Sequence, residues 1–168
     1  MVEFEVVSLP PADHPDVGEG APEFTRPLVN REFWEDRSLS ELTREGPVLL
    51  LFHSMDGAFP ALYTWKEVRE RALDDRVRTV GLSISTPYEH KRFLEERGLD
   101  VALFSDPGNG VAERYGVVND LDGMSGLSEP RPAVFLIDTE GTIRYAWAAS
   151  EHPEFPPWDE VETAIDDL

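Results

Sequence analysis

The chain has 168 residues, of which 40% are hydrophobic and 10% aromatic, and this composition is typical of one folded domain rather than a disordered segment. Its 34 acidic and 15 basic residues give a net charge of −19. It contains no cysteine, which excludes disulfides, thiolate metal sites, iron–sulfur clusters and every reaction that uses a thiol of this chain.

The negative charge limits the partners that we expect. An acidic surface repels nucleic-acid phosphates and anionic membrane surfaces, so we expect no nucleic acid and no membrane. No apolar run reaches the length of about 18 residues that spans a bilayer. Residues 1–5 (MVEFE) lack the positively charged start of a signal peptide. We therefore expect a cytoplasmic protein.

The acidic residues are spread along the whole chain, and only Lys66 and Lys91 are lysines. This pattern favours a halophilic protein, because molar salt screens the repulsion between carboxylates to a Debye length of roughly 3 Å. An ordinary acidic protein is the alternative interpretation.

Residues 1–23 are rich in proline and glycine, and we expect residues 1–17 to form an N-terminal extension. Val6 and Val7 within this extension are candidates for a short edge strand. The folded domain is expected over residues 18–168. We find no internal repeat and no low-complexity tract.

The first part of the domain indicates a strand–helix–strand unit. A short helix is predicted over 39–45, entered at Ser38, and residues 48–52 (VLLLF) are apolar on both faces, as in a central strand covered by helices. Apolar residues then recur at helical spacing over 62–72, and residues 77–84 predict a second strand. This order implies parallel strands with a right-handed crossover.

The second part of the domain supplies further helices and an antiparallel strand pair. The predicted elements are a helix from Thr86 to Arg97, a strand over 101–104, a helix from Asn109 to Gly116, strands over 133–137 and 142–147, and a final helix from near Pro157. Thr86 and Glu89 have the spacing of a capping box. The turn before residue 142 is too short for a parallel crossover. We predict an α/β fold with a central mixed β-sheet and helices on both faces.

Several short strings stand in a recurring order: 20–25 (GAPEFT), 38–42 (SLSEL), 81–83 (GLS), 104–107 (FSDP), 111–117 (VAERYGV), 131–138 (RPAVFLID) and 141–144 (GTIR). Their order and spacing resemble the peroxiredoxins, of the alkyl hydroperoxide reductase and thiol-specific antioxidant (redoxin) type. The resemblance covers residues from about 18 to 148. It implies a thioredoxin-like fold of the peroxiredoxin subtype, and the family activity that it implies is that of an oxidoreductase, an antioxidant thiol peroxidase.

The chain departs from this family at the active loop. The family's loop reads Pro-x-x-x-Thr/Ser-x-x-Cys after the first core strand, and these positions fall on Ser54, Ala58 and Ala61. In the family, the cysteine thiolate attacks the peroxide O–O bond, the hydroxyl orients the peroxide and an arginine stabilises the charge. An alanine methyl group cannot attack, so we expect no catalytic residue here.

Four residues remain as candidates for binding. Arg131 matches the family's site arginine and would bind a small anion; the alternative is a structural arginine paired with a carboxylate. Pro132 matches the residue that carries a cis peptide opposite the active loop in the thioredoxin fold. His53 and Met55 follow the first core strand, where open α/β sheets place ligands. Met55 is otherwise interpreted as a filler of the core.

Other kinds of site are not expected. His53 and Ser54 are adjacent on an extended chain and therefore point apart, which disfavours a hydrolase pair. The other histidines, which are His14, His90 and His152, lack the spacing of metal ligands. We expect no metal and no cofactor.

Two hypotheses for the function follow. In the first, the chain is redox-inactive and acts as a binding or interaction module for a small anion near Arg131 or for a protein partner. Because members of the family are often dimers or larger rings, the resemblance also implies a homodimer. In the second, it is an active antioxidant thiol peroxidase whose cysteine has been replaced at Ala61. The simultaneous departures at Ser54 and Ala58 favour the first, since one replacement would be enough to remove activity.

Overall fold

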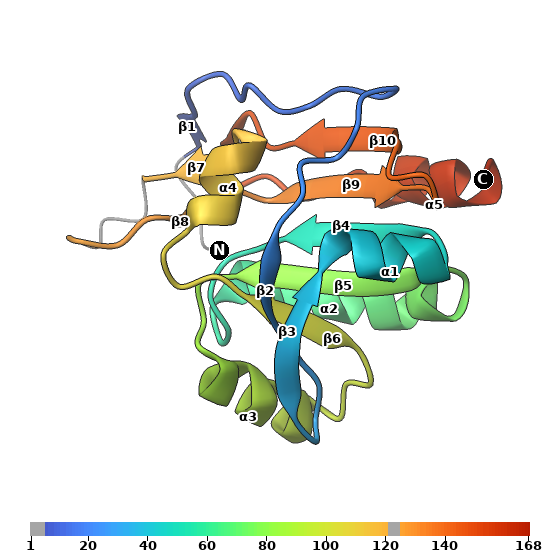
Figure 1. The fold of residues 1–168 in the computed structure, drawn as a ribbon. Coiled ribbons are helices and arrows are strands. Elements are labelled where there is room, and N and C mark those ends of the chain that lie inside the picture. Colours follow the sequence, from blue (N-terminus) through green and yellow to red (C-terminus); the bar gives the residue numbers. More distant parts are fainter. Residues whose placement is uncertain (1–5, 121–124) are drawn as a thin grey trace.

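The computed structural model describes residues 6–120 and 125–168, and its centre is a seven-stranded mixed sheet with helices on both faces (Figure 1). The strands are β1 (Val7–Ser8), β2 (Thr25–Val29), β3 (Trp34–Ser38), β4 (Val48–Phe52), β5 (Arg78–Ser83), β6 (Ala102–Ser105), β7 (Val118–Asn119), β8 (Glu129–Pro130), β9 (Ala133–Ile137), β10 (Ile143–Ala148) and β11 (Glu151–His152). The helices are α1 (Leu39–Glu45), α2 (Phe59–Glu70), α3 (Pro87–Arg97), α4 (Gly110–Tyr115) and α5 (Trp158–Asp166), with a 3₁₀ turn at Leu73–Asp75. Each helix in the described residues is too short or too polar to cross a membrane.

The strand order across the sheet is β10–β9–β4–β5–β6–β2–β3. Strands β4, β5 and β6 are parallel neighbours, which places the predicted strand–helix–strand unit at the centre. Strand β9 is antiparallel to β4, and β10 is antiparallel to β9. The predicted α/β architecture with a mixed sheet is therefore confirmed, as is the antiparallel final pair.

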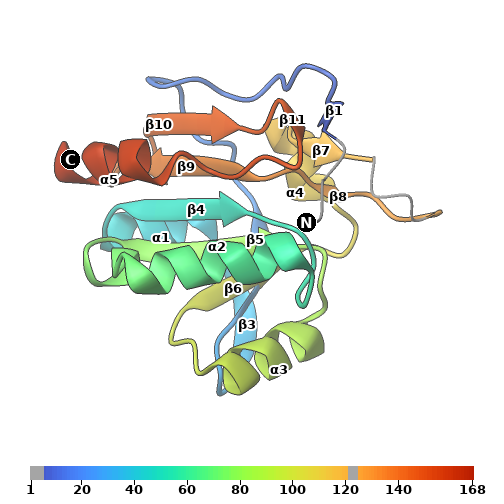
Figure 2. The same cartoon turned by 180° about the vertical axis from the view of Figure 1, so that it is seen from behind.

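The two faces of the sheet carry separate apolar clusters, and β4 contributes to both. Val48, Leu50 and Phe52 pack with side chains of α1 and α4, which lie on the side that faces the viewer in Figure 1. Leu49 and Leu51 pack with side chains of α2, α3 and α5 on the side shown in Figure 2. Alternate side chains of a strand point to opposite faces, so a fully apolar strand requires cover on both sides.

The hairpin of β2 and β3 was not predicted from the sequence. The two strands pair over their full length, and β2 also pairs with β6, so β3 forms one edge of the sheet. Their sequences, TRPLV and WEDRS, mix charged and apolar residues. Charged side chains are tolerated at an edge because water solvates the exposed face there.

The predicted helix starts agree with the structure. Ser38 precedes α1, and its hydroxyl accepts a hydrogen bond from the Glu41 backbone N–H at 3.2 Å. At α3, the Thr86 hydroxyl accepts from the Glu89 N–H at 3.3 Å, and the Glu89 carboxylate accepts from the Thr86 N–H at 3.0 Å. These bonds satisfy amides that have no partner within the helix.

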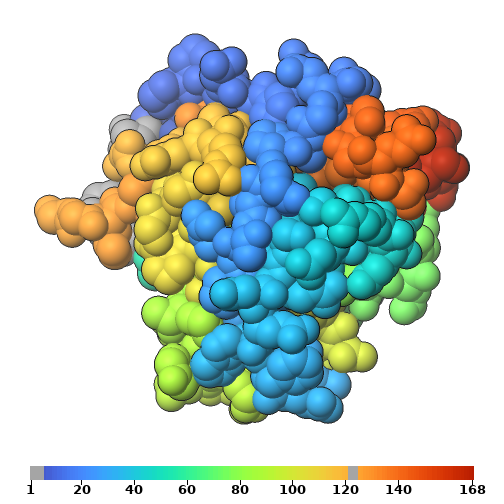
Figure 3. Space-filling view, viewed as in Figure 1, coloured from blue at the N-terminus to red at the C-terminus, as the bar shows by residue number. Residues whose placement is uncertain are grey.

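The N-terminal segment lies against the domain. The expected edge strand is shifted by one residue, to Val7–Ser8, and pairs with β11. Leu9 is buried, and its N–H donates to the Ser150 carbonyl at 3.0 Å. In Figure 3 this segment covers the top of the molecule. Residues 1–5 of the expected extension lie outside the described residues.

Candidate functional site

The positions of the expected active loop lie at the C-terminal end of β4, where residues 53–58 lead into α2 (Figure 2). Ala58 precedes the helix, and Pro60 occupies its first turn, where a missing N–H costs nothing. Ala61 lies in the same turn, and none of its side chain is exposed. A buried methyl group therefore lies at the position where the sequence analysis expected the family's nucleophile.

His53 opens this loop as a neutral, fully engaged side chain. Its Nδ1–H donates to the Ser54 carbonyl at 2.7 Å, and its Nε2 accepts from the Trp65 indole N–H at 3.3 Å. A carbonyl can only accept and an indole N–H can only donate, so these partners fix one neutral tautomer. Burial, the main cause, lowers the pKa of His53 to about 4. His53 therefore supports the loop and has no lone pair left for a substrate.

Asp56 and His90 fasten the middle of the loop to α3 and β6. The Asp56 carboxylate lies 2.6 Å from His90 Nδ1, and His90 Nε2 lies 3.0 Å from the Phe104 carbonyl. Both ring nitrogens thus face oxygen acceptors, so the imidazole is held from two sides. The Asp56 N–H donates to the Ser85 hydroxyl at 2.8 Å. His90 is completely buried, so this pair holds the loop in place.

A cavity of about 230 Å³, which we call the inner cavity, opens beside this loop. Its walls come from the loop, from the junction of β8 and β9, and from the segment that follows β10; the lining residues are Ser54, Ala58, Pro60, Asn119, Glu129, Pro130, Pro132, His152, Pro153, Glu154 and Phe155. None of these described lining residues is an arginine or a lysine. The cavity is therefore apolar and acidic.

Two polar residues that line the inner cavity, Glu129 and Ser54, are almost completely buried. Glu129 is 5% exposed, and its carboxylate accepts a hydrogen bond from the Met55 backbone N–H at 3.0 Å. Ser54 is 8% exposed, and its hydroxyl has no hydrogen-bond partner within the described part of the chain. A buried hydroxyl without a partner is costly, so a ligand group that reached this atom would gain a hydrogen bond.

Arg131 does not line the inner cavity. Its guanidinium donates to three backbone carbonyls, those of Val118 (3.0 and 3.1 Å), Pro10 (2.8 Å) and Ala149 (3.1 Å). It is 4% exposed, and burial lowers the pKa of its side chain. Arg131 is thus a structural arginine, but its acceptors are carbonyls rather than the carboxylate considered in the sequence analysis.

Pro132, rather than Arg131, faces the loop. Adjacent residues of an extended segment point to opposite sides, so the burial of Arg131 among carbonyls directs Pro132 into the inner cavity. The peptide bond before Pro132 is trans, which corrects the expected cis geometry. Among the described residues, the cis peptide bond is that between His152 and Pro153.

The remaining expected residues contribute backbone rather than side-chain chemistry. Met55 is half-buried, and its contact with Glu129 is made by its N–H, not by its sulfur. The Ser54 hydroxyl is not paired with His53, whose ring is bonded to the Ser54 carbonyl instead. His53 is therefore not placed to activate Ser54 as a base.

Sequence reasoning missed Glu129 and the segment 152–155, which complete the inner cavity. Glu129 stands between serine and proline in the string SEPRP, without a recognisable motif. The segment 152–155 reaches the cavity because β11 pairs with β1. Within the described residues, no group of three or more histidine, aspartate or glutamate side chains is arranged to hold a metal ion.

Comparisons with known proteins agree with this fold. Residues 17–146 match the AhpC/TSA family. A peroxiredoxin bcp of Coxiella burnetii is 30% identical over 139 residues, which cover 79% of this chain and 87% of that protein. Peroxiredoxin Q of Triticum aestivum is 27% identical, and the match covers 64% of this chain and 49% of that protein. The chain thus spans only about half of this longer, chloroplastic relative.

Solved structures confirm the thioredoxin-like fold of the peroxiredoxin subtype. Peroxidoxin BcpB of Mycobacterium tuberculosis is 25% identical and superposes with a TM-score of 0.69, covering 91% of this chain and 96% of that one. A thiol peroxidase of Chromobacterium violaceum is 23% identical with a TM-score of 0.76, covering 93% of this chain and 89% of that one. The fold is therefore shared, although this chain has no cysteine, on whose thiol a thiol peroxidase depends.

Proposed function

The chain belongs to the AhpC/TSA family, and we propose that it works without thiol chemistry, as a binding or interaction module built on the family's fold. The observation that carries this proposal is the buried methyl group of Ala61 in a chain with no cysteine. Reduction of a peroxide by a thiol needs a thiolate to attack the O–O bond and become a sulfenic acid. This chain has no atom that can take that role.

The geometry of the loop supports the same proposal. Among the described residues that line the inner cavity, Ser54 supplies the hydroxyl, and the neighbouring His53 has both ring nitrogens engaged. A serine without a base is a weak nucleophile. The cavity is better suited to holding a molecule than to transforming one.

The walls of the inner cavity favour a small ligand with an apolar body and a neutral or cationic donor group. Its prolines, Ala58 and Phe155 supply apolar surface, while the Ser54 hydroxyl and the Glu129 carboxylate supply acceptors. A small anion, which the sequence suggested, would meet Glu129 and Glu154 and would not reach the guanidinium of Arg131. We therefore propose that the ligand of the inner cavity carries a neutral or cationic hydrogen-bond donor.

The loss of peroxidase activity is tested by following hydrogen peroxide in the presence of the purified protein and a dithiol reductant. We expect the rate to equal that of a heat-denatured sample, because neither a peroxidatic nor a resolving thiol exists. A cysteine-containing family member under identical conditions serves as the positive control. Turnover above the heat-denatured sample would overturn the proposal.

The second hypothesis, a peroxidase in which Ala61 replaces a natural cysteine, is tested on the gene. The proposal expects an alanine codon at position 61, together with the codons for Ser54 and Ala58 that the sequence shows. A cysteine codon at position 61 would favour the peroxidase.

A further inference from the structure

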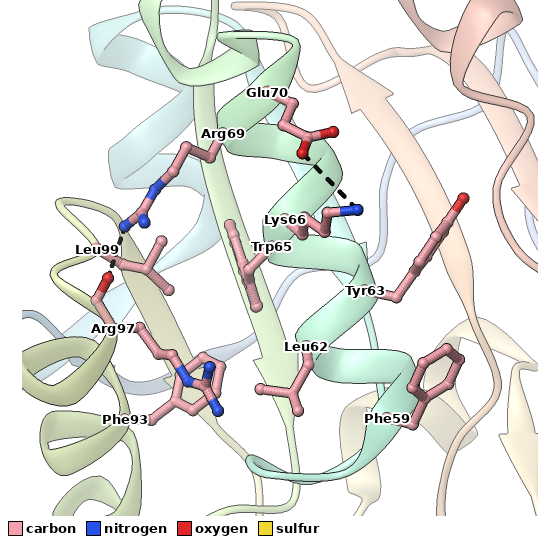
Figure 4. Close-up of a pocket in the computed structure, with 10 residues that line it drawn as sticks. All are labelled: Phe59, Leu62, Tyr63, Trp65, Lys66, Arg69, Glu70, Phe93, Arg97 and Leu99. Carbon is pink, nitrogen blue, oxygen red and sulfur yellow. Dashed lines mark hydrogen bonds and ion pairs between the residues drawn. The ribbon is translucent and has the colours of Figure 1, made fainter.

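A second hollow lies between α2 and α3 on the face shown in Figure 2, and we call it the outer groove. Its volume is about 660 Å³, which is within the range of about 300–1,000 Å³ typical of small-molecule sites. Figure 4 shows side chains of both helices directed toward it. The three motif positions of the expected active loop, Ser54, Ala58 and Ala61, do not line it, although Phe59 does.

The floor of the outer groove is apolar. Leu62 and Trp65 of α2, Phe93 of α3 and Leu99 beyond α3 form it, and Trp65, Phe93 and Leu99 are each less than a tenth exposed. The two helices are joined near their C-terminal ends, where the Arg69 guanidinium donates to the carbonyls of Arg97 (2.7 Å) and Gly98 (2.9 Å). This bond keeps the groove closed at one end.

The rim of the groove has the opposite charge to the protein as a whole. Lys66, Arg69 and Arg97 line it against a single acid, Glu70, although the chain carries a net charge of −19. Lys66 lies 3.7 Å from Glu70, a distance that makes a weak, exposed pair. The Arg97 guanidinium has no acidic partner among the described residues, and in Figure 4 its side chain extends into the groove.

We propose that the outer groove binds an amphipathic monocarboxylic acid, with its hydrocarbon chain on the apolar floor and its carboxylate on the Arg97 guanidinium. A planar guanidinium matches a carboxylate with two parallel hydrogen bonds, and such charge-assisted bonds are stronger beside apolar surface. A single negative charge also meets the least repulsion from the acidic surface, whereas a nucleic acid or an acidic protein would meet far more. This site is separate from the inner cavity and does not depend on the proposed function.

The test compares octanoate, octanol and octylammonium, which share one hydrocarbon chain and differ in charge. Each is titrated into ¹⁵N-labelled protein below its micelle-forming concentration, and backbone amide shifts give the site and the affinity. We expect octanoate to bind roughly tenfold more tightly than the other two, with shifts at Leu62, Phe93 and Leu99. Octylammonium binding as tightly as octanoate, shifts confined to Ser54 and Glu129, or no binding of octanoate would each overturn the proposal.

Reversing the charge of Arg97 tests whether this residue binds the carboxylate of octanoate. Arg97→Glu should weaken octanoate binding by roughly tenfold or more, while octanol binding stays within about twofold. Arg92→Glu is the matched control, because Arg92 is exposed on the same helix but does not line the groove. It makes the same change in net charge and should leave octanoate binding almost unchanged. An equal loss in both variants would mean that only the overall charge acts, and would overturn the assignment to Arg97.

Discussion

The inner cavity and the outer groove differ in size, in charge and in what each suggests about the family. The inner cavity, of about 230 Å³, lies beside the expected active loop and is lined by Glu129 and Glu154. The outer groove, of about 660 Å³, lies away from that loop and is rimmed mostly by basic residues. A shared fold therefore indicates where to look for the family's reaction, whereas charge and burial decide what each hollow of this chain can hold.

Trp65, which lines the outer groove, is hydrogen-bonded to His53, which precedes Ser54 of the inner cavity, and the most damaging single change should be made at this contact. Gly81 of β5 lies against both rings: a Cβ atom at this position would be 2.5 Å from Trp65 Cζ2 and 2.6 Å from His53 Nε2. We expect Gly81→Ala to reduce the free energy of unfolding by about 3 kcal/mol or more, because neither ring can move without breaking their hydrogen bond. Urea unfolding measures this change.

Gly108→Ala is the control for that variant, because a Cβ atom at Gly108 has no neighbouring atom within 4 Å. We expect the control to change the free energy of unfolding by less than about 0.5 kcal/mol. Equal losses of unfolding free energy in the two variants would contradict the view that Gly81 packs against these two rings.

Acid should also destabilise the protein at the contact between Trp65 and His53, with a smaller loss in the free energy of unfolding. The unfolded chain protonates His53 near its ordinary pKa of 6.5, whereas burial lowers the native pKa to about 4. Between these values the unfolded state holds more protons, so stability that is complete above pH 6.5 is lost as the pH falls toward 4. This one group should contribute up to about 3 kcal/mol, measured as the free energy of unfolding against pH.

A neutral replacement identifies the group responsible for the acid effect. His53→Gln is expected to flatten the dependence on pH in this window, since an amide does not titrate there. The control, His152→Gln, removes a half-exposed histidine and should leave the slope almost unchanged. If His53→Gln retained the full slope, the loss of stability would have to come from other groups.

The smallest effect should be the charge preference of the inner cavity. Isobutylammonium, isobutyramide and isobutyrate share one apolar body, and we expect the first two to bind roughly tenfold more tightly, equivalent to about 1.4 kcal/mol. Amide shifts at Ser54 and Glu129 report this binding. Together with the octanoate series, the result would show whether the two hollows have opposite preferences.

Glu129→Gln keeps an acceptor for the Met55 N–H but removes the charge, so it should reduce the preference for isobutylammonium. Glu113→Gln, an exposed change on α4 outside the cavity, is its control. Preferential binding of isobutyrate would contradict the preference for hydrogen-bond donors and would favour the small-anion hypothesis for the inner cavity.

Strands and helices with a strong local signal could be predicted from the sequence. Val48–Phe52 is apolar on both faces, and Thr86 with Glu89 forms a capping box; both are as predicted. Strands β2 and β3 escaped prediction because their mixed charged and apolar sequences carry no local strand pattern, and β3 is suited to its place by lying at the edge of the sheet. The halophilic adaptation and the homodimer stay predictions.

The candidate site was less predictable, because it depends on the direction in which side chains point as well as on their positions in the sequence. Ala61 and Ser54 could be placed by their distance from β4 along the chain. Arg131 and Pro132 are neighbours that face opposite sides, so only the structure shows which of them reaches the loop. Glu129 and the segment 152–155 arrive from elsewhere in the chain, and no local pattern marks them.

The hydrogen bond from Trp65 to His53 requires a neutral imidazole, and it joins segments that contribute to both hollows. It uses the one lone pair that keeps the imidazole uncharged, and a proton that takes this lone pair would set two N–H groups against each other. Trp65 belongs to the floor of the outer groove, while Ser54, which accepts from the other ring nitrogen, belongs to the inner cavity. Protonation of this one histidine would therefore break the hydrogen bond that joins the floor of the outer groove to the segment leading into the inner cavity.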